Sequence, residues 1–467
     1  MSRCLHQLFA ARAARDPDAL AVVLGGSNGS DDPASRLTYR QVDERSNDLA
    51  HRLRAAGVGP EAVVGIYATH SPEMIVALWG VLKAGGAYLP LDERAPEARV
   101  AAVLDEADVR VVVTAHPRPP EPVCQRLCVP VARTEGEINP AEPVNVALPQ
   151  NRAMVLFTSG STGKPKGIDL PHASLVSEYW AWEAAYELNA GVRNHSQIAS
   201  FPFGVFQADV IRAHGSGGKL VLCSWETVSA PQKLAEVLAR EEVHYAEFVP
   251  AVLRGLLQQV KEKGERLPAS LRFLVVGSDR WYVREHRELE ALCQGRTRPI
   301  HSFGATETSF DTAWFNGASV ELSPHQLTPL GRPFNGVRVH IAGPGLERLP
   351  QGQTGEMLVA GGGITRGYFG NPALTAEKFI PDPFSPEPGA RLYRSGDLAR
   401  VLADGNIEFL GRADSQVKVR GYRIELGEIE AALEQHPAIR ECVVVAREDA
   451  PGETRLVAYI VPREVTS

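Results

Sequence analysis

The chain has few cysteines, no long uninterrupted apolar run and no excess of basic charge. Its 467 residues include six cysteines, four methionines and only 7% aromatic residues. The longest apolar stretches, such as residues 74–82, contain too few residues to span a bilayer, so they are expected to form core helices. The sequence therefore predicts no membrane-spanning segment and no membrane partner.

The charge balance is slightly acidic, with 49 lysines and arginines against 56 aspartates and glutamates and a net charge of -7. General binding of nucleic acid or of an anionic membrane requires a net basic face, so we predict neither partner; a local basic pocket stays open. The N-terminus places Arg3, His6, Arg12 and Arg15 among apolar residues at helical spacing, without a cleavage signal. This pattern predicts a cytoplasmic protein.

The cysteines give little indication of a metal site. They are scattered, and only Cys124 and Cys128 are close, with three residues between them and no nearby pair of histidines. Reduced structural thiols are the better interpretation of this spacing.

Length and periodicity predict an α/β protein of several subdomains. The chain is longer than one hydrophobic core usually organises. Apolar strands alternate with helices from residue 19 to residue 303, which predicts a large N-terminal core of two parallel or mixed α/β subdomains. The expected helices are 72–84, 100–106, 173–188, 231–241 and 251–259, and the expected strands are 63–68, 88–91, 109–114, 197–200, 245–249, 271–276 and 300–303.

The character of the sequence changes twice after that core. Short strands separated by Gly and Pro begin at about residue 328 and predict a β-rich subdomain. A strand at 416–419, a helix at 426–434 and strands at 441–446 and 456–461 then predict the start of a small α+β C-terminal subdomain. We therefore divide the chain into a core, residues 1–411, and a hinge with a partial C-terminal subdomain, residues 412–467, which we expect to be truncated or interrupted.

A loop rich in Gly, Ser and Thr stands at the centre of the chain. The apolar run 154–157 predicts a buried strand, and every residue from Thr158 to Gly163 is Gly, Ser or Thr. Glycines let the backbone approach an anion, hydroxyls and amides donate hydrogen bonds, and Lys164 and Lys166 bring positive charge, so the loop suits phosphate. A flexible polar loop is the alternative for such a run taken alone.

The loop is not a Walker A motif. Only two residues separate Gly160 from Gly163, and Pro165 follows the lysine. A P-loop needs four residues between its glycines and a Ser or Thr after the lysine. A P-loop NTPase or a kinase is therefore disfavoured.

Further polar clusters follow apparent strand ends, where α/β proteins build their sites. They are Phe-Gly-Ala-Thr-Glu at 303–307, Tyr-Arg-Ser-Gly-Asp-Leu at 393–398 and Gly-Arg-Ala-Asp at 411–414. Each is weak alone, because Asp and Gly are common turn residues. In order, however, they resemble the motif series of the adenylate-forming enzymes, most closely the adenylation domains of nonribosomal peptide synthetases. The likeness runs from residue 5 to the end, with supporting stretches at 37–39, 82–92, 355–368 and 416–428.

The resemblance implies ATP-dependent activation of a carboxylic acid. The carboxylate attacks the α-phosphate, pyrophosphate leaves, and the acyl adenylate passes to the phosphopantetheine thiol of a peptidyl carrier protein, in cis or in trans. Such chemistry relies on positioning and on neutralising phosphate charge. The cofactors implied are ATP and Mg²⁺.

The motifs imply a role for each matching residue. Thr306, Glu307 and Lys166 are the implied catalytic residues: Thr306 touches the α-phosphate, Glu307 binds Mg²⁺, and Lys166 holds the outer phosphates. Asp414 lies at the hinge about which the family rotates its small subdomain between adenylation and thioester formation. The implied ATP-binding residues are Thr158, Ser159, Gly160, Ser161, Thr162, Gly163, Lys166, Gly277, Phe303, Gly304, Asp397 and Arg412.

The first departure from the family concerns the substrate. In amino-acid-activating members a Phe-Asp pair supplies the carboxylate that holds the α-ammonium group, whereas here Gly204 follows Phe203. An ammonium group buried without its counter-ion costs several kcal/mol. The sequence therefore argues against an ordinary α-amino acid and favours an α-keto or α-hydroxy acid, or an aryl acid such as anthranilate.

The remaining pocket positions are mostly small or apolar, which predicts a branched or aromatic acid. Glu247 and Asp311 are the exceptions. If either points inward it can hold a displaced amine, as in a β-amino or aryl amino acid; the alternative is that both face a loop or solvent. The predicted acid pocket comprises Phe203, Gly204, Val205, Ala208, Glu247, Leu274, Val276, Ser302, Phe310 and Asp311.

The second departure is that the family's C-terminal Asn-Gly-Lys motif does not occur before Ser467. We therefore expect weak adenylation by the isolated chain. Interruption near this point resembles depsipeptide synthetases, whose substrates are α-keto acids, so an α-keto acid is favoured and an aryl acid comes next. The alternatives are an acyl- or aryl-CoA ligase of the same superfamily and, in a different class, a non-catalytic nucleotide-binding scaffold.

Overall fold

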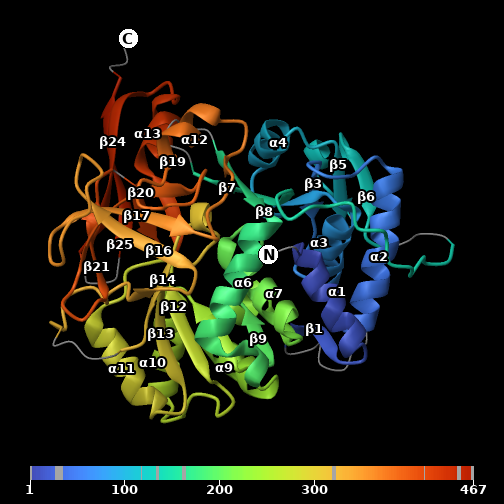
Figure 1. Ribbon diagram of the computed structural model, residues 1–467, viewed down its shortest axis with the longest axis horizontal. Coiled ribbons are helices and arrows are strands. Elements are labelled where there is room, and N and C mark those ends of the chain that lie inside the picture. Colours follow the sequence, from blue (N-terminus) through green and yellow to red (C-terminus); the bar gives the residue numbers. More distant parts are fainter. Residues whose placement is uncertain are drawn as a thin grey trace.

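The structure is a computed structural model of the chain (Figure 1). It describes residues 3–26, 35–116, 118–132, 136–159, 165–317, 322–414, 416–449 and 454–463.

The first large sheet has the strand order β18-β8-β7-β4-β3-β5-β6, in which β8 turns back antiparallel to β7. Its strands are β3 (Val63–Tyr67), β4 (Ala87–Pro90), β5 (Val111–Thr114), β6 (Leu127–Pro130), β7 (Arg152–Thr158), β8 (Lys166–Pro171) and β18 (Gly367–Tyr368). The helices that accompany it are α2 (Tyr39–Ala55), α3 (Pro72–Ala84), α4 (Glu97–Glu106) and α5 (Glu121–Cys124).

Local sequence explains the bounds of α3, which the sequence predicted at 72–84. Pro72 is at its first turn, where a missing N–H costs nothing, and Gly85 ends it in the left-handed region at φ 93°. A Cβ on Gly80 would lie 2.6 Å from Cδ2 of Leu49, so the glycine permits the close packing of α3 on α2.

The second large sheet has the order β15-β14-β13-β12-β11-β9-β10-β1-β2, and its central strands β13, β12, β11, β9, β10 and β1 run parallel. Its strands are β1 (Leu20–Gly25), β2 (Arg36–Thr38), β9 (Asn194–Gln197), β10 (Lys219–Cys223), β11 (Tyr245–Phe248), β12 (Phe273–Gly277), β13 (Arg298–Phe303), β14 (Ala313–Phe315) and β15 (Arg332–Pro333). Its helices are α1 (Leu5–Arg15), α6 (His172–Tyr186), η2 (Leu188–Ala190), α7 (Gly204–Ser216), α8 (Trp225–Val228), α9 (Pro231–Arg240), α10 (Pro250–Glu262), α11 (Val283–Cys293) and η3 (Thr306–Thr308).

Helices α6 and α7 lie between the two large sheets in Figure 1. The largest apolar core is continuous across them, because it joins Leu156 of β7 and Val22 of β1 to Leu175 of α6 and Phe206 of α7. The parallel α/β class predicted from the sequence is confirmed.

The predicted helix list omitted α7, and the strand expected at 197–200 ends at Gln197. Helix α7 lacks an amphipathic pattern because its polar residues are buried on all sides, among them Gln207, Asp209, Arg212 and His214. Periodicity alone could not separate this helix from a loop.

The later part of the chain is β-rich, as predicted. Strands β16 (Val337–Ala342), β17 (Gly355–Gly361), β19 (Phe379–Pro381), β20 (Arg391–Val401) and β21 (Ile407–Arg412) form an antiparallel sheet, with α12 (Pro372–Lys378) beside it. The hairpin of β22 (Gln416–Val419) and β23 (Tyr422–Glu425), helix α13 (Leu426–Glu434) and the hairpin of β24 (Ile439–Glu448) and β25 (Thr454–Pro462) follow.

Candidate active site

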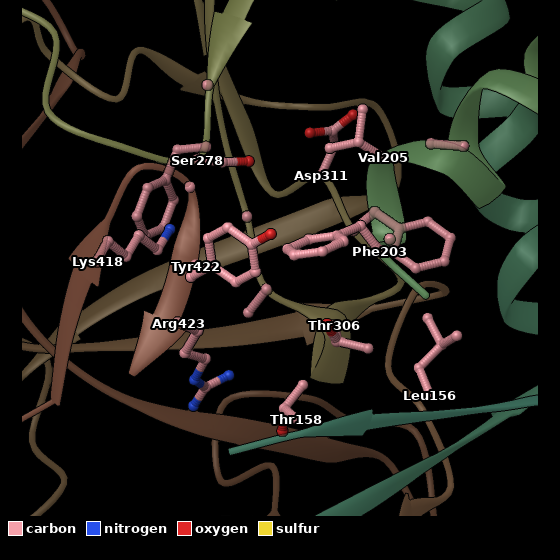
Figure 2. A pocket seen from close by; sticks show the side chains of 18 of the residues that line it. Leu156, Thr158, Phe203, Val205, Ser278, Thr306, Asp311, Lys418, Tyr422 and Arg423 are labelled. Carbon is pink, nitrogen blue, oxygen red and sulfur yellow. The ribbon is translucent and has the colours of Figure 1, made fainter. Parts of the chain in front are cut away.

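A cavity of about 340 Å³ lies where β7, β12 and β13 end, and the first turn of α7 and the β22–β23 hairpin close it. The carboxyl ends of parallel strands are where α/β proteins bind ligands. Figure 2 shows Tyr422 and Lys418 of the hairpin facing Phe203 and Thr306 of the core across the cavity. The rings of Phe203 and Tyr422 meet edge to face with centroids 4.9 Å apart.

The cavity collects side chains that are far apart in the sequence. The predicted site residues that line it are Thr158, Ser159, Phe203, Gly204, Val205, Ala208, Glu247, Gly277, Ser302, Phe303, Gly304, Thr306, Phe310, Asp311, Asp397 and Arg412.

Other predicted site residues do not line this cavity: Lys166, Glu307, Asp414, Leu274 and Val276. The first three lie close by, through contacts described below. The predicted phosphate-binding residues Gly160, Ser161, Thr162 and Gly163 lie outside the described residues.

Leu274 and Val276 are not brought to the cavity because side chains alternate along β12. Both are fully buried in the apolar cluster on the far face of the sheet, with Leu234 and Leu253 of the outer helices. The register pairs Glu247 with Val275, which belongs to the core on the cavity side. The predicted pocket positions on β12 are therefore offset by one residue from the strand's inner face.

Glu307 is fully buried beside the cavity, on η3. Nη1 of Arg423 donates to both its oxygens, at 2.9 Å and 2.7 Å, and the hydroxyl of Tyr368 donates to Oε1 at 2.9 Å. Burial opposes ionisation, but the charges of Arg423 and Lys166 prevail and lower the pKa of Glu307 to about 2. Glu307 is an anion held by the hairpin.

The hairpin also contacts the ends of the central loop. The hydroxyl of Ser159 donates to the carbonyl oxygen of Arg423 at 2.7 Å. Nζ of Lys166 donates to Oε1 of Glu425 at 3.0 Å. Lys166 is therefore paired with the hairpin and does not line the cavity.

Asp397 and Arg412 face one another on β20 and β21. Nη1 of Arg412 donates to Oδ1 of Asp397 at 2.6 Å, and its Nε and Nη2 donate to the two oxygens of Asp414, both at 2.7 Å. Burial raises the pKa of Asp397, and the charge of Arg412 opposes that shift. The predicted ribose acceptor and the predicted hinge residue therefore share one guanidinium.

Phe303 presents its ring near a partly buried cation. Nζ of Lys418 lies 5.0 Å from the ring centroid, and burial lowers the pKa of Lys418. The ring of Phe303, which lines the cavity, suits stacking with a planar heteroaromatic base.

Phe310 fills the space beside Gly204. A Cβ on Gly204 would lie 2.6 Å from Cδ1 and 3.0 Å from Cε1 of that ring. Phe310 takes the left-handed backbone conformation at φ 91°, which a bulky residue adopts only when its surroundings impose it. The position at which the family resemblance predicts an aspartate carries glycine in this chain, and an apolar ring covers it.

Glu247 and Asp311 line the cavity and are only 6% and 7% exposed, so neither faces solvent. Both are bound by Arg212 of α7: Nη2 donates to Oε2 of Glu247 at 2.6 Å, and Nη1 donates to Oδ2 of Asp311 at 3.5 Å. Burial raises the pKa of Glu247 to about 7.

Sequence reasoning did not assign several residues of this site. Lys418, Tyr422 and Arg423 lie within the motif at 416–428, which signalled the hairpin but not its contacts. Arg212 gave no signal, because α7 was not predicted. The unassigned residues that line the cavity include Leu156, Ser278, Tyr393, Ser395, Gln416, Lys418, Tyr422 and Arg423.

Comparison with protein families decides the class of this site. The model of the AMP-binding enzyme family matches residues 9–369, and that of the AMP-binding enzyme C-terminal domain matches residues 428–467. The chain belongs to the AMP-binding enzyme family. The predicted membership of the adenylate-forming enzymes is confirmed, and the chain is an adenylate-forming ligase of the nonribosomal peptide synthetase adenylation-domain type.

Curated members of the AMP-binding family match nearly the whole chain. Gramicidin S synthase 2 of Brevibacillus brevis is 37% identical over 464 residues, which is 98% of this chain and 10% of that protein. Chondramide synthase cmdD of Chondromyces crocatus is 38% identical over 475 residues, 98% of this chain and 12% of that protein. The chain thus spans about a tenth of the length of such relatives.

Solved structures of the family share the fold. An artificially fused adenylation–PCP di-domain, NpsA-ThdA from Klebsiella oxytoca, has a TM-score of 0.83 at 25% identity and covers 100% of this chain and 90% of that one. The nonribosomal peptide synthetase FmoA3, in a form bound to α-methyl-L-serine-AMP, has a TM-score of 0.78 at 29% identity and covers 88% of this chain and 45% of that one.

Adenylation domains use Mg²⁺, an ion that takes oxygen ligands and is commonly held by one or two carboxylates together with substrate phosphates. Within the described ranges no group of three or more His, Cys, Asp or Glu side chains is arranged as a metal site. The ionised Glu307, next to Thr306, fits a cation that phosphates hold on its other sides. Because Arg423 occupies its oxygens, coordination there requires Arg423 to withdraw.

For the part of the chain that the structure describes, no helix combines the length and hydrophobicity needed to cross a membrane.

Proposed function

We propose that this adenylation domain activates a carboxylic acid that has no α-ammonium group, using ATP and Mg²⁺, and passes the acyl group to the phosphopantetheine thiol of a carrier protein. The observation that carries the substrate proposal is the Gly204–Phe310 contact. With Phe310 against Gly204, the place of an ammonium counter-ion is taken by a ring that offers no charge.

The nucleotide end of the cavity supports ATP as the co-substrate. Phe303 provides a ring for the base, Asp397 provides a buried carboxyl group for ribose hydroxyls, and Arg412 fixes its orientation. Thr306 supplies a hydroxyl between this end and the acid pocket. The arrangement binds and orients the reactants, as the reaction requires.

Magnesium supplies charge neutralisation for the leaving pyrophosphate when it is bound. In this chain Glu307 would hold it, with Thr306 nearby and Lys166 contributing charge once its contact with Glu425 is released. The Arg423–Glu307 pair belongs to the other orientation of the small subdomain, in which the hairpin occupies the metal's carboxylate.

The acid pocket supports two subclasses. An α-keto acid has no ammonium group and therefore needs no counter-ion. Its side chain can pack against the apolar wall of Val205, Ala208 and Phe310. An aryl acid bearing an amine satisfies these and also uses Glu247, a carboxyl group at the cavity wall that accepts hydrogen bonds from described groups at Oε2 alone. The sequence places the α-keto acid first. The cavity supports the amine-bearing aryl acid as the second candidate.

A panel of α-keto acids, aryl acids and their α-amino counterparts, assayed with ATP and hydroxylamine, tests the proposal. We expect hydroxamate from α-keto or aryl acids and at most a trace from the matching α-amino acids, with AMP as the nucleotide product. Preference for α-amino acids would refute the substrate proposal. Release of ADP, or no ATP-dependent stabilisation at all, would refute the adenylation chemistry in favour of a kinase or of a scaffold.

A further inference from the structure

Arg212 is a fully buried cation just outside the acid pocket. It lies on α7, two turns after Gly204, and does not line the cavity. Its guanidinium is packed between the rings of Trp182 and Tyr245, with centroid distances of 4.7 Å and 4.6 Å. These two ring contacts and the hydrogen bonds of its N–H groups restrict the orientation of the guanidinium.

Three carboxyl groups surround this one cation. Nη2 donates to Oδ1 of Asp209 at 2.7 Å and to Oε2 of Glu247 at 2.6 Å, and Nη1 donates to Oδ2 of Asp311 at 3.5 Å. Burial raises the pKa of Asp209 well above its usual range. Glu247 and Asp311 therefore share one guanidinium with Asp209.

The hydrogen bonds identify which oxygen is open to a ligand. Both oxygens of Asp311 are occupied, Oδ1 by the hydroxyl of Ser302 at 2.5 Å and Oδ2 by Nε1 of Trp182 at 2.8 Å. Oε2 of Glu247 accepts from Arg212 and from the hydroxyl of Tyr245, the latter at 3.2 Å. No described group donates to Oε1 of Glu247, although this residue is only 6% exposed and its exposed part lines the cavity.

We propose that Arg212 is a specificity-determining positioning residue, which holds Glu247 by one oxygen so that the other accepts an N–H from an amino group on the acid, remote from its carboxylate. The inference rests on the proposed function and, among its candidate acids, selects amino-aryl or β-amino acids over the α-keto acid. A buried acceptor that goes unpaired is costly, so the same arrangement rejects acids that place a methyl group there.

Matched pairs of acids test this without relying on turnover. Anthranilate, meta-aminobenzoate and para-aminobenzoate are compared with the three corresponding toluates, and β-phenylalanine with hydrocinnamate, by titration calorimetry of the full chain with AMP and Mg²⁺ present. In at least one pair we expect the amine to bind about tenfold to a hundredfold more tightly than its partner, the range of a hydrogen bond to a charged group.

Variants then separate positioning from folding. Glu247→Gln and Arg212→Met should each lower that amine-to-methyl affinity ratio at least about tenfold, and Arg212→Lys should restore part of it. Arg152→Met, which removes a mostly buried arginine paired with Asp169 on β8, is the control and should leave the ratio unchanged. If Arg212→Met does not fold, the affinity ratios of Glu247→Gln and Arg212→Lys test the inference.

Two outcomes would overturn the inference, and they are distinguishable. Equal affinity for amine and methyl partners in the unaltered chain, with α-amino acids still rejected, refutes the role of Arg212 and leaves the proposed function standing. Tighter binding of α-amino acids than of every other acid refutes the proposed function itself.

Discussion

Nη1 of Arg423 donates hydrogen bonds to both oxygens of Glu307, at 2.9 Å and 2.7 Å. The pair joins β23, in the segment after residue 412, to η3 of the core. A partly buried guanidinium and a divalent cation cannot share one carboxylate without strong repulsion. Hairpin docking and metal coordination at Glu307 are therefore mutually exclusive.

Arg423→Gln should weaken hairpin docking and leave the metal's carboxylate open. We expect thioester transfer to a carrier protein to slow at least about tenfold, since a charged hydrogen-bonded pair is lost, while ATP-pyrophosphate exchange falls much less. The two half-reactions are measured separately by radiolabelled exchange and by loading of the carrier.

The control for this variant is Arg447→Gln, which removes an exposed ion pair with Asp449 on the terminal hairpin. Exposed pairs contribute little, so neither half-reaction should change. An equal loss of both half-reactions in Arg423→Gln would contradict the exclusion argument and assign Arg423 a general structural role.

Gly204→Asp should destabilise the fold and fail to create an α-amino acid site. Even a Cβ at this position would lie 2.6 Å from the ring of Phe310, so the ring must shift. Overpacking of this kind costs about 1–3 kcal/mol of unfolding free energy. Adding Phe310→Ala should recover most of that loss and allow an α-amino acid to bind, as chemical denaturation and calorimetric titration would reveal.

Gly59→Asp is the matched control, because nothing lies within 4 Å of a Cβ at that glycine. Its unfolding free energy should change little. Full stability of Gly204→Asp on its own would show that Phe310 moves freely, and the substrate argument built on that ring would fail.

Elements with a clear apolar period were predictable from sequence, and the polar interior was not. Helix α3 starts at Pro72 and ends before Gly85 as predicted, because composition and capping agree there. Gln207 and Arg212 of helix α7 are fully buried. In the sequence, a buried polar residue cannot be distinguished from a surface residue until its partners are known.

The same limit applies to the candidate site. The order of the motifs was enough to select Phe303, Asp397 and Arg412, which do line one cavity. The pair between Glu307 and Arg423 spans 116 residues, and pairing at that distance depends on how the hairpin docks. Identifying the residues of β12 that face the cavity required the strand register, because a shift of one residue exchanges the two faces of a strand.

Glu178→Gln should stabilise the protein at neutral and alkaline pH. Glu178 is almost completely buried on α6, where burial first and the charge of Asp311 second raise its pKa well above its usual range. The folded state therefore holds a proton that the unfolded chain releases above its ordinary pKa of about 4.3. The stability of the unaltered protein falls as pH rises through that window, and the glutamine variant removes this loss.

Denaturant unfolding from pH 4 to pH 8 measures that difference. The advantage of Glu178→Gln should be smallest at the acid end and grow with pH. Glu106→Gln, at the exposed end of α4, reports the effect of the same substitution without burial. An advantage that shrinks as pH rises would mean that Glu178 is ionised in the folded protein.

Asp397→Asn should weaken ATP binding, because the buried carboxyl group that Arg412 orients into the cavity loses its charge. A charged hydrogen bond is worth about 1.5–3 kcal/mol, so we expect the dissociation constant of ATP to rise at least about tenfold. At a fixed excess of ATP, a tenfold loss of affinity removes about 1.4 kcal/mol of ligand-induced stabilisation. Glu408→Gln, which breaks a pair with Arg400 on the same two strands, is the control and should leave that stabilisation intact. Equal stabilisation of Asp397→Asn and the unaltered chain by ATP would place the ribose elsewhere, and the assignment of the Phe303 ring to the base would fail with it.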